Sequence, residues 1–378
     1  MGILSAPSRR WAAPAAVVLA VGVVAGGTMI SASAAPELPA RTAAQLLVDL
    51  QSAQVDGVSG TVVENADLGL PAMPVPGGGQ GSSDLSSLIS GSHTLRVWYD
   101  GPERVRVALL GTLGESDVIR NGPDLWTWSS QQNVATHRVL PDTHRSEGPM
   151  TDLPLTPQQA AEQALDALDP STAVSTDGTA KVAGRAAYEL VLAPRDDRSL
   201  VGQVRIAVDA ATHIPLRVQM VARGHTSPAF EVGFTHVSFD RPDANQFRFT
   251  PPPGARIVTS GDRDEAEHRS PAGVHSEPGL ARDHPDSSGT GPATVGSGWT
   301  QVAVFRGSSP ISALTGSEPD GEATNLGGVL AALPHVSGDW GSGRLLRSAL
   351  FTALLTDDGR LLVGPVGPDL VFQAAAHR

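Results

Sequence analysis

The sequence predicts a mainly β protein of the α+β class, in which helices cover one face of a large antiparallel sheet and a small α+β domain follows. Apolar and polar side chains alternate in short runs across residues 181–255, with Gly, Pro, Asp or Asn between the runs. A similar series occupies residues 94–140, and a helix with clear ends separates the two series. Such alternation, interrupted by turn residues, is typical of antiparallel strands with one buried face.

Composition limits the classes of function. The 378 residues are enough for two domains with a sizeable core. The formal net charge of −12 argues against a nucleic-acid partner, because neutralising phosphates requires clustered Lys and Arg. Cysteine is absent from the sequence, which excludes disulfides, thiolate zinc sites, cysteine nucleophiles and the lipidated cysteine of a lipoprotein.

Residues 1–34 have the features of a secretory signal peptide. An arginine pair at 9–10 precedes an apolar run at 15–30, and Ala-Ser-Ala at 32–34 supplies the small residues before a cleavage site. An uncleaved membrane anchor is the alternative, because the apolar stretch approaches the ~20 residues that cross a bilayer. In either case we expect the protein to be extracytoplasmic, either secreted or associated with the cell envelope.

A helix and a strand are expected before the first series of strands. Thr42 and Gln45 form a capping box, a stripe of leucines extends the helix to residue 53, and residues 58–63 form the strand. Residues 68–90 are rich in Pro, Gly and Ser and predict a loop over one side of the sheet. Their glycines lack the following Lys-Ser/Thr of a phosphate-binding loop.

The first series of strands is expected at residues 94–99, 104–110, 116–120, 125–129 and 136–140. Asp-Gly and Asn-Gly between these runs indicate hairpin turns. Trp98, Trp126 and Trp128 place half of the six tryptophans in this small region. Their rings either pack in the core or line an apolar cavity.

A second helix follows. Thr156 is expected to cap it, with Pro157 in its first turn, Gln159 completing a capping box and Pro170 beyond its end. Its apolar stripe of alanines and leucines predicts that it packs across the open face of the sheet, which the strands of residues 181–255 complete.

Within residues 181–255, Val204, Ile206 and Val208 share one face of a strand because side chains alternate along it. We expect a turn at 209–213. The prolines at 251–253 are expected to end the sheet, since proline cannot donate to a sheet ladder.

The remaining chain divides into two parts. Residues 259–298 are polar and rich in acidic side chains without a long apolar run, and therefore predict a disordered linker. Residues 299–378 predict a small α+β domain. Its expected elements are strands at 299–306, 345–355 and 360–366 and helices at 326–333 and 368–376.

The sequence contains none of the common motifs for catalysis, metal binding or phosphate binding. We therefore expect no cofactor, no metal and no enzymatic activity. A hydrolase is a remote alternative, since Ser342 lies between glycines and His335 is near in the chain, although the glycine spacing of a nucleophile motif is not met. Neighbouring acidic pairs such as Asp357-Asp358 fit exposed turns better than acid–base chemistry.

Three segments resemble the superfamily of LolA-like lipoprotein carriers and MucB/RseB-like sigma-E regulators: VAGRAAYELVLAPRD, VRIAVDAATHIPLR and FTHVSFDRPDANQFRFTPPPGA. The capped helix TPQQAAEQALDALDP fits the same plan, and the resemblance covers residues 38–258. It implies a curved, unclosed antiparallel sheet, or half-barrel, with helices packed on its concave face and an apolar cavity that accepts acyl chains. The regulatory branch, to which the patterns at 184–190 and 209–216 are closer, adds a smaller C-terminal domain and controls an anti-sigma factor.

The expected organisation is thus a signal peptide or anchor at 1–34, a half-barrel domain at 35–258, a linker at 259–298 and a small domain at 299–378. The expected function is a non-catalytic carrier or sensor that binds a lipid or an acylated lipoprotein, because each buried methylene contributes ~0.8 kcal/mol. The alternative is a regulator that binds an extracytoplasmic membrane partner such as an anti-sigma factor.

Candidate cavity residues are apolar side chains of both strand series, placed by alternation and by the implied fold. They are Leu95, Val97, Val105, Val107, Trp126, Trp128, Leu190, Leu192, Val204, Ile206 and Leu216. For each of them, packing in an ordinary filled core is the alternative to contact with a ligand.

Overall fold

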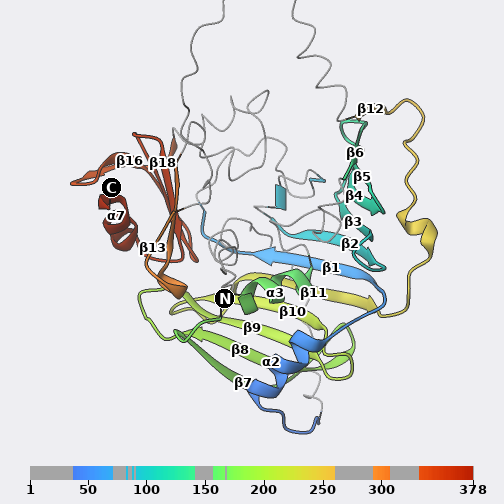
Figure 1. Cartoon of the computed structure of the whole chain (residues 1–378), viewed down its shortest axis with the longest axis horizontal. Coiled ribbons are helices and arrows are strands. Elements are labelled where there is room, and N and C mark those ends of the chain that lie inside the picture. Colours follow the sequence, from blue (N-terminus) through green and yellow to red (C-terminus); the bar gives the residue numbers. More distant parts are fainter. Residues whose placement is uncertain are drawn as a thin grey trace, which may run out of the picture.

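The computed structural model describes residues 37–70, 82–83, 87–88, 91–140, 156–166, 168–259, 293–306 and 332–377. They form a 12-stranded sheet and a six-stranded sheet (Figure 1). The expected signal peptide, most of the expected loop at 68–90, most of the expected linker and most of the helix expected at 326–333 lie outside the described residues. None of the described helices combines the length and apolar character needed to cross a membrane.

The large sheet contains both predicted series of strands, in the order β12-β6-β5-β4-β3-β2-β1-β11-β10-β9-β8-β7. The first series is β1 (Val58–Ala66), β2 (His93–Tyr99), β3 (Arg104–Leu110), β4 (Glu115–Asn121), β5 (Asp124–Ser129) and β6 (Val134–Val139). The second is β7 (Thr172–Val182), β8 (Arg185–Pro194), β9 (Val201–Asp209), β10 (Pro215–Ala222) and β11 (Pro228–Ser238).

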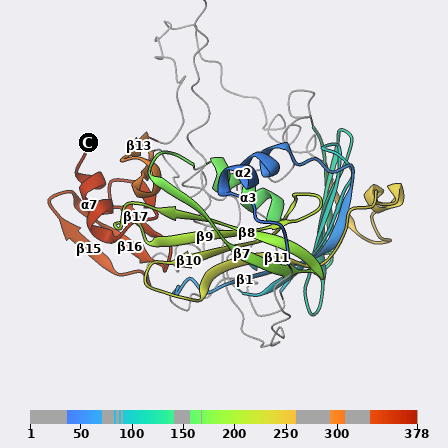
Figure 2. The same cartoon turned by 90° about the horizontal axis from the view of Figure 1, so that it is seen from below.

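Strand β1 joins the two series, because it pairs antiparallel with β2 on one side and with β11 on the other. The sheet is curved and unclosed, with β2–β6 turned away from the plane of β7–β11 in both views (Figures 1 and 2). The half-barrel predicted from the sequence is therefore confirmed.

The chain does not leave the sheet at the prolines of 251–253, which corrects that expectation. After β11 it forms the 3₁₀ helix η3 (Ala244–Phe247) and then β12 (Arg256–Thr259), which pairs parallel with β6 at the far edge of the sheet. A short parallel edge strand depends on a distant partner. The alternation of its own side chains does not reveal it.

Helices α2 (Ala43–Ser52) and α3 (Pro157–Asp166) lie against the concave face of the sheet (Figure 2). Thr42 Oγ1 accepts a hydrogen bond from Gln45 N at 3.2 Å while Gln45 Oε1 accepts one from Thr42 N at 2.9 Å, so the predicted capping box is present. Thr156 Oγ1 likewise accepts from Gln159 N at 3.2 Å. The caps define where each helix begins and thus which side chains meet the sheet.

The small sheet has the order β13-β14-β18-β17-β16-β15 and packs against α7 (Pro368–Ala376), whose bounds are those predicted. Its strands are β13 (Ala293–Val295), β14 (Val302–Arg306), β15 (His335–Gly338), β16 (Gly341–Arg347), β17 (Thr352–Thr356) and β18 (Arg360–Gly364). The 3₁₀ helix η4 (Gly298–Thr300) lies between β13 and β14. Strand β13 falls within the segment expected to be linker.

The single strand expected at 345–355 is wrong, because this segment contains the end of β16, a turn and most of β17. Ser348 closes the turn: its amide donates to the carbonyl of Phe351 at 2.9 Å, and its hydroxyl oxygen accepts from the amides of Leu350 and Phe351. The apolar run continues through the turn, since Leu350 and Phe351 are buried. Because Ser348 is flanked by the apolar run Ala349–Phe351 and no Gly, Pro, Asn or Asp accompanies it, the sequence pattern did not show the reversal.

The two sheets contact each other directly. Ser199 and Val366 form an isolated bridge between them, and Leu200 N donates to Pro365 O at 2.8 Å. The buried side chains of Leu350 and Phe351 belong to the same apolar cluster as the core of the large sheet. The described part of the C-terminal tail is therefore packed on the half-barrel.

Candidate functional site

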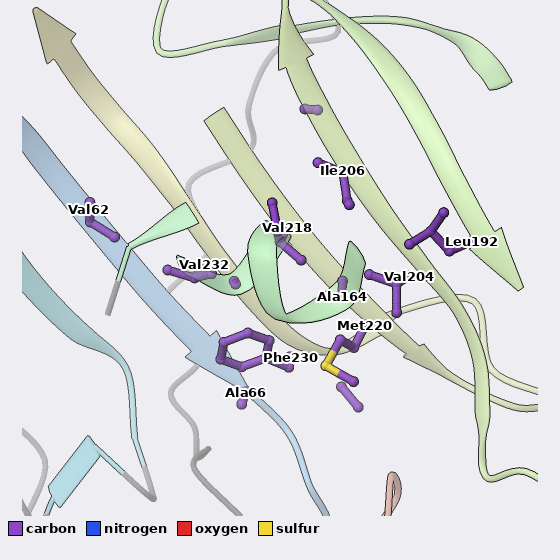
Figure 3. Packing of buried hydrophobic residues seen from close by; sticks show 14 of the residues in the cluster. Val62, Ala66, Ala164, Leu192, Val204, Ile206, Val218, Met220, Phe230 and Val232 are labelled. Carbon is purple, nitrogen blue, oxygen red and sulfur yellow. The ribbon is translucent and has the colours of Figure 1, made fainter. Parts of the chain in front are cut away.

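The concave face of the large sheet carries a continuous cluster of buried apolar side chains beneath α2 and α3 (Figure 3). Figure 3 shows α3, with Ala164, lying over Val204, Val218 and Met220 of β9 and β10. Eight of the eleven candidate cavity residues are buried members of this cluster, and Val105 is half-buried against it. The eight are Leu95, Val97, Val107, Leu190, Leu192, Val204, Ile206 and Leu216.

Strand register explains why these residues meet. Leu95 lies opposite Leu109 in the β2–β3 pair, and Leu190 lies opposite Ile206 in the β8–β9 pair. Directly opposite residues of an antiparallel pair share a face of the sheet, and every second residue along a strand shares it too. The alternation seen in the sequence thus becomes one apolar surface across both series of strands.

Trp126 and Trp128 do not belong to this surface, which corrects their assignment. Opposite pairs connect Trp98 to Arg106, Arg106 to Ile119, and Ile119 to Trp126, so these residues share the face opposite to Val97. Trp126 stacks on His137 with ring centroids 4.3 Å apart.

A segment after η3 covers the same tryptophans. Phe249 lies 5.4 Å from Trp126 and 6.0 Å from Trp128 between ring centroids. These indoles are half-buried on the outer face, so they neither fill the concave core nor line a cavity there. Sequence alternation gives the period of a strand, and Leu125 and Thr127 take the other face of β5.

Two buried ionisable side chains face each other on the concave face where the two series of strands meet, and sequence reasoning missed both. Glu64 of β1 and His93 of β2 are directly opposite each other, with exposed fractions of 6% and 3%. Their closest atoms, Glu64 Oε2 and His93 Nδ1, are 3.6 Å apart, and Ser87 Oγ lies 3.3 Å from His93 Nε2. Burial raises the pKa of Glu64, and the interaction with His93 opposes that rise. The available signal was that Glu64 falls between Val62 and Ala66 in the buried alternation.

The outer face of the second series of strands is polar. Glu189, itself buried, accepts hydrogen bonds from Arg217 Nη2 at 2.8 Å and from Arg205 Nε at 3.2 Å, and Arg205 also pairs with Asp177 at 2.7 Å. Arg217 crosses over Gly233, where a Cβ atom would come within 3.1 Å of its Cγ. These side chains line part of a 380 Å³ cleft. Their positive and negative charges balance, so this cleft is held together by its own ion pairs.

Ser342 and His335, the residues of the remote hydrolase alternative, both contact Asp357. Ser342 Oγ donates a hydrogen bond to this carboxylate, and His335 Nε2 lies 3.2 Å from it. In a serine hydrolase the imidazole lies between the serine and the carboxylate, whereas here the carboxylate lies between the other two. The hydrogen bonds from Ser342 and His335 hold the pKa of Asp357 below its usual value, so it is a weak base. This arrangement does not activate the serine.

Within the described ranges, His, Asp and Glu side chains nowhere gather in a group of three or more suited to a metal ion.

Comparisons with known proteins gave one family match and several similar solved structures. Residues 91–246 match the MucB/RseB N-terminal domain family. None of the curated proteins searched matches the chain. The solved MucA/MucB complex of Pseudomonas aeruginosa is similar at 17% identity and a TM-score of 0.42, over 88% of this chain and 96% of that chain. An uncharacterised conserved protein from Thermus thermophilus is 13% identical with a TM-score of 0.33, over 57% and 98% of the two chains.

A LolA superfamily protein from Nitrosomonas europaea has 11% identity and a TM-score of 0.22, over 56% of this chain and 99% of that chain. The family match includes the strands from β2 to β11 and leaves out β1 and β12 at its two ends. Residues 91–246, which lie in the half-barrel, thus match the MucB/RseB N-terminal domain.

Proposed function

We propose that this chain is a non-catalytic, extracytoplasmic binding protein that holds acyl chains of a lipid or an acylated lipoprotein at the concave face of its large sheet. The observation that carries the proposal is the continuous apolar cluster formed there by both series of strands and covered by α2 and α3. The match to the MucB/RseB N-terminal domain supports the same class of protein.

The chemistry of the face suits an acyl chain. The fully buried side chains that the described part of helix α3 contributes to the cluster are the alanines Ala160, Ala161 and Ala164, with Leu165 partly buried beside them, so the larger side chains of the sheet form most of the apolar surface. Each methylene removed from water contributes ~0.8 kcal/mol, which allows binding without covalent chemistry. A site of this kind selects by length and apolar area rather than by hydrogen bonds.

Native mass spectrometry of the exported protein after gentle purification tests the proposal. We expect a bound species with the mass of a lipid, and displacement of a fluorescent fatty acid by unlabelled lipid. A ligand-free mass together with no binding of the fluorescent fatty acid would overturn the proposal.

A regulatory role toward a membrane partner, such as an anti-sigma factor, is the second candidate. The family match favours this role. The direct packing of the small sheet on the half-barrel favours it too, because a partner bound to the small sheet would then affect the half-barrel. Because the sequence has no cysteine, single-cysteine crosslinking is specific. We expect Ser337→Cys, on the edge strand β15, to crosslink to a membrane protein in intact cells, and Glu103→Cys, on the β2–β3 turn, to give no such product. Equal products from both positions would contradict this role.

The division of the chain into residues 1–34, 35–258, 259–298 and 299–378 belongs to the proposal as well. N-terminal sequencing of the exported protein tests its first boundary. Cleavage after Ala34 is expected, and an intact N-terminus in the membrane fraction would favour the anchor instead.

A further inference from the structure

Glu64 and His93 interrupt the apolar concave face at the junction of the two series of strands. Val62 and Ala66 flank Glu64 on the same face of β1, and Leu95 follows His93 on the same face of β2; all three belong to the apolar cluster. Stability alone does not require an ionisable pair inside this apolar cluster, because well-packed apolar side chains of similar volume stabilise a protein at least as well.

The pair is also incompletely satisfied. Glu64 Oε2 and His93 Nδ1 are buried and have no hydrogen-bond partner among the described residues, because the 3.6 Å between them exceeds hydrogen-bond length. Buried polar atoms without a hydrogen-bond partner are uncommon in folded proteins. Where one occurs, a bound ligand or a functional role can explain it. A hydroxyl group both donates and accepts, so a single hydroxyl can serve a carboxylate oxygen and an imidazole nitrogen together.

The surroundings of the pair narrow the class of ligand. The Glu64 carboxyl lies beside the His93 ring, and the side chains that flank the two residues on this face are apolar. An added carboxylate or phosphate group would be buried next to another carboxyl and among apolar side chains, which is unfavourable. An uncharged polar group meets no such penalty.

Ser87 and Leu88 show that a hydroxyl group and an apolar group can be accommodated together beside His93. Ser87 Oγ lies 3.3 Å from His93 Nε2, and Leu88, 2% exposed, is a member of the apolar cluster. The protein itself thus places a hydroxyl group, that of Ser87, next to His93, with the apolar side chain of Leu88 following it. An acyl lipid with a hydroxyl-bearing head presents the same two features.

We propose that Glu64 and His93 form the head-group end of the acyl site, and that the head they bind is an uncharged hydroxyl-bearing group, as in a monoacylglycerol. This inference rests on the proposed acyl-binding function and adds the chemistry of the polar end.

The test compares three ligands that share an 18-carbon chain: 1-oleoylglycerol, oleic acid and 1-octadecene. Binding of each to the exported full chain is measured by displacement of a fluorescent acyl probe. We expect 1-oleoylglycerol to bind about tenfold more tightly than the other two, the effect of a hydrogen-bonded pair. The double substitution Glu64→Leu with His93→Leu should remove this preference while hydrocarbon binding remains.

Thr94→Val is the matched control, because Thr94 adjoins His93 but points to the opposite face and should leave the preference unchanged. A second readout avoids dependence on the folding of the double variant. The imidazole ¹⁵N resonances of His93, identified by their loss in His93→Gln, should shift with 1-oleoylglycerol and stay in place with 1-octadecene.

Each other outcome overturns the inference. Tighter binding of oleic acid than of 1-oleoylglycerol contradicts the uncharged head group. A preference that survives in the double variant, or unchanged His93 resonances, removes these residues from the site while acyl binding stands. Failure of all three ligands to bind the natural protein overturns the proposed function together with the inference.

Discussion

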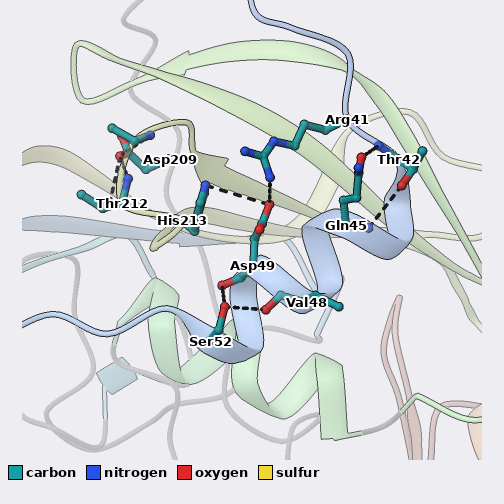
Figure 4. A network of polar contacts seen from close by, with 10 residues as sticks. Arg41, Thr42, Gln45, Val48, Asp49, Ser52, Asp209, Thr212 and His213 are labelled. Atoms are coloured by element: carbon teal, nitrogen blue, oxygen red, sulfur yellow. Dashed lines mark hydrogen bonds and ion pairs between the residues drawn. The ribbon is translucent and has the colours of Figure 1, made fainter.

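Arg185 and Asp209 form a two-point ion pair between β8 and β9, with Nε to Oδ1 at 2.5 Å and Nη2 to Oδ2 at 2.9 Å. The same carboxylate accepts hydrogen bonds from the amide and the hydroxyl of Thr212, both at 2.8 Å (Figure 4). Asp209 therefore ties the second series of strands to the β9–β10 turn. His213 of that turn lies 3.9 Å from Asp49, which also pairs with Arg41 and so links the turn to α2.

Asp209→Asn should lower the free energy of unfolding by about 2 kcal/mol, because the buried carboxylate loses its charge-assisted hydrogen bonds from Arg185 and Thr212. Chemical denaturation at neutral pH measures the change. Asp196→Asn is the control, since Asp196 pairs with Arg198 on an exposed turn and should change stability little. Equal effects of the two substitutions would contradict the role of Asp209.

The same pair has a pH dependence of known sign. Burial alone would raise the pKa of Asp209, but hydrogen bonds from Arg185 and Thr212 hold the pKa below its usual value. A carboxyl with a depressed folded-state pKa stabilises the protein above its unfolded pKa, and this contribution is lost as pH falls through the folded value. Asp209→Asn should therefore destabilise the protein less at pH 3 than at pH 7, as measured by thermal unfolding at both.

Asp117 has the opposite pH dependence. Burial and the neighbouring Glu115 raise the pKa of Asp117 to about 6, and Arg106, whose Nε lies 2.7 Å from Oδ1, opposes the rise. Between the unfolded value near 4 and this folded value the native state binds more protons, so the free energy of unfolding falls as pH increases. Asp117→Asn should remove this decrease, of roughly 2–3 kcal/mol, from denaturation curves taken between pH 4 and pH 7. Parallel profiles for the natural and substituted proteins would show that Asp117 does not titrate in this range.

Features encoded by nearby residues were predictable from the sequence. The capping box at Thr42, the hydrogen bond from Gln159 N to Thr156 and the bounds of α7 follow from side chains within a few residues of each helix end. The strands of the concave face follow from strict alternation, and eight of the eleven candidate cavity residues are buried together for that reason.

Features that depend on distant partners were not predictable. Strand β12 exists because it meets β6, and the first half of β7 is mostly polar because that strand is an edge of the sheet. Glu64 and His93 come to lie opposite each other only through the register between β1 and β2. The outer-face packing of Trp126 and Trp128 was not predictable either, because it depends on Phe249, which is far away in the sequence.

The two faces of the sheet should differ in their effect on acyl binding. Ala164→Leu enlarges a buried side chain of α3 directly over the concave face, so it should weaken binding of a fluorescent fatty acid about tenfold, at a stability cost of roughly 1–3 kcal/mol. Trp126→Ala removes a larger side chain from the outer face and should leave the affinity unchanged. Loss of binding in Trp126→Ala alone would place the ligand on the outer face.

The small sheet should unfold together with the half-barrel. Phe351 and Leu350 extend from the β16–β17 turn into the apolar cluster of the large sheet, and Ala349 N donates to Leu68 O at 2.7 Å. Phe351→Ala should therefore lower the stability of both sheets by about 3–5 kcal/mol, because it leaves a cavity where they meet. Trp340→Ala, which removes the ring stacked on Phe372 in the separate cluster between the small sheet and α7, should lower the unfolding temperature while the two sheets still unfold in one transition. Calorimetry distinguishes the two: Phe351→Ala should split one unfolding transition into two, and a single transition at an unchanged temperature would show that the sheets are not coupled through this side chain.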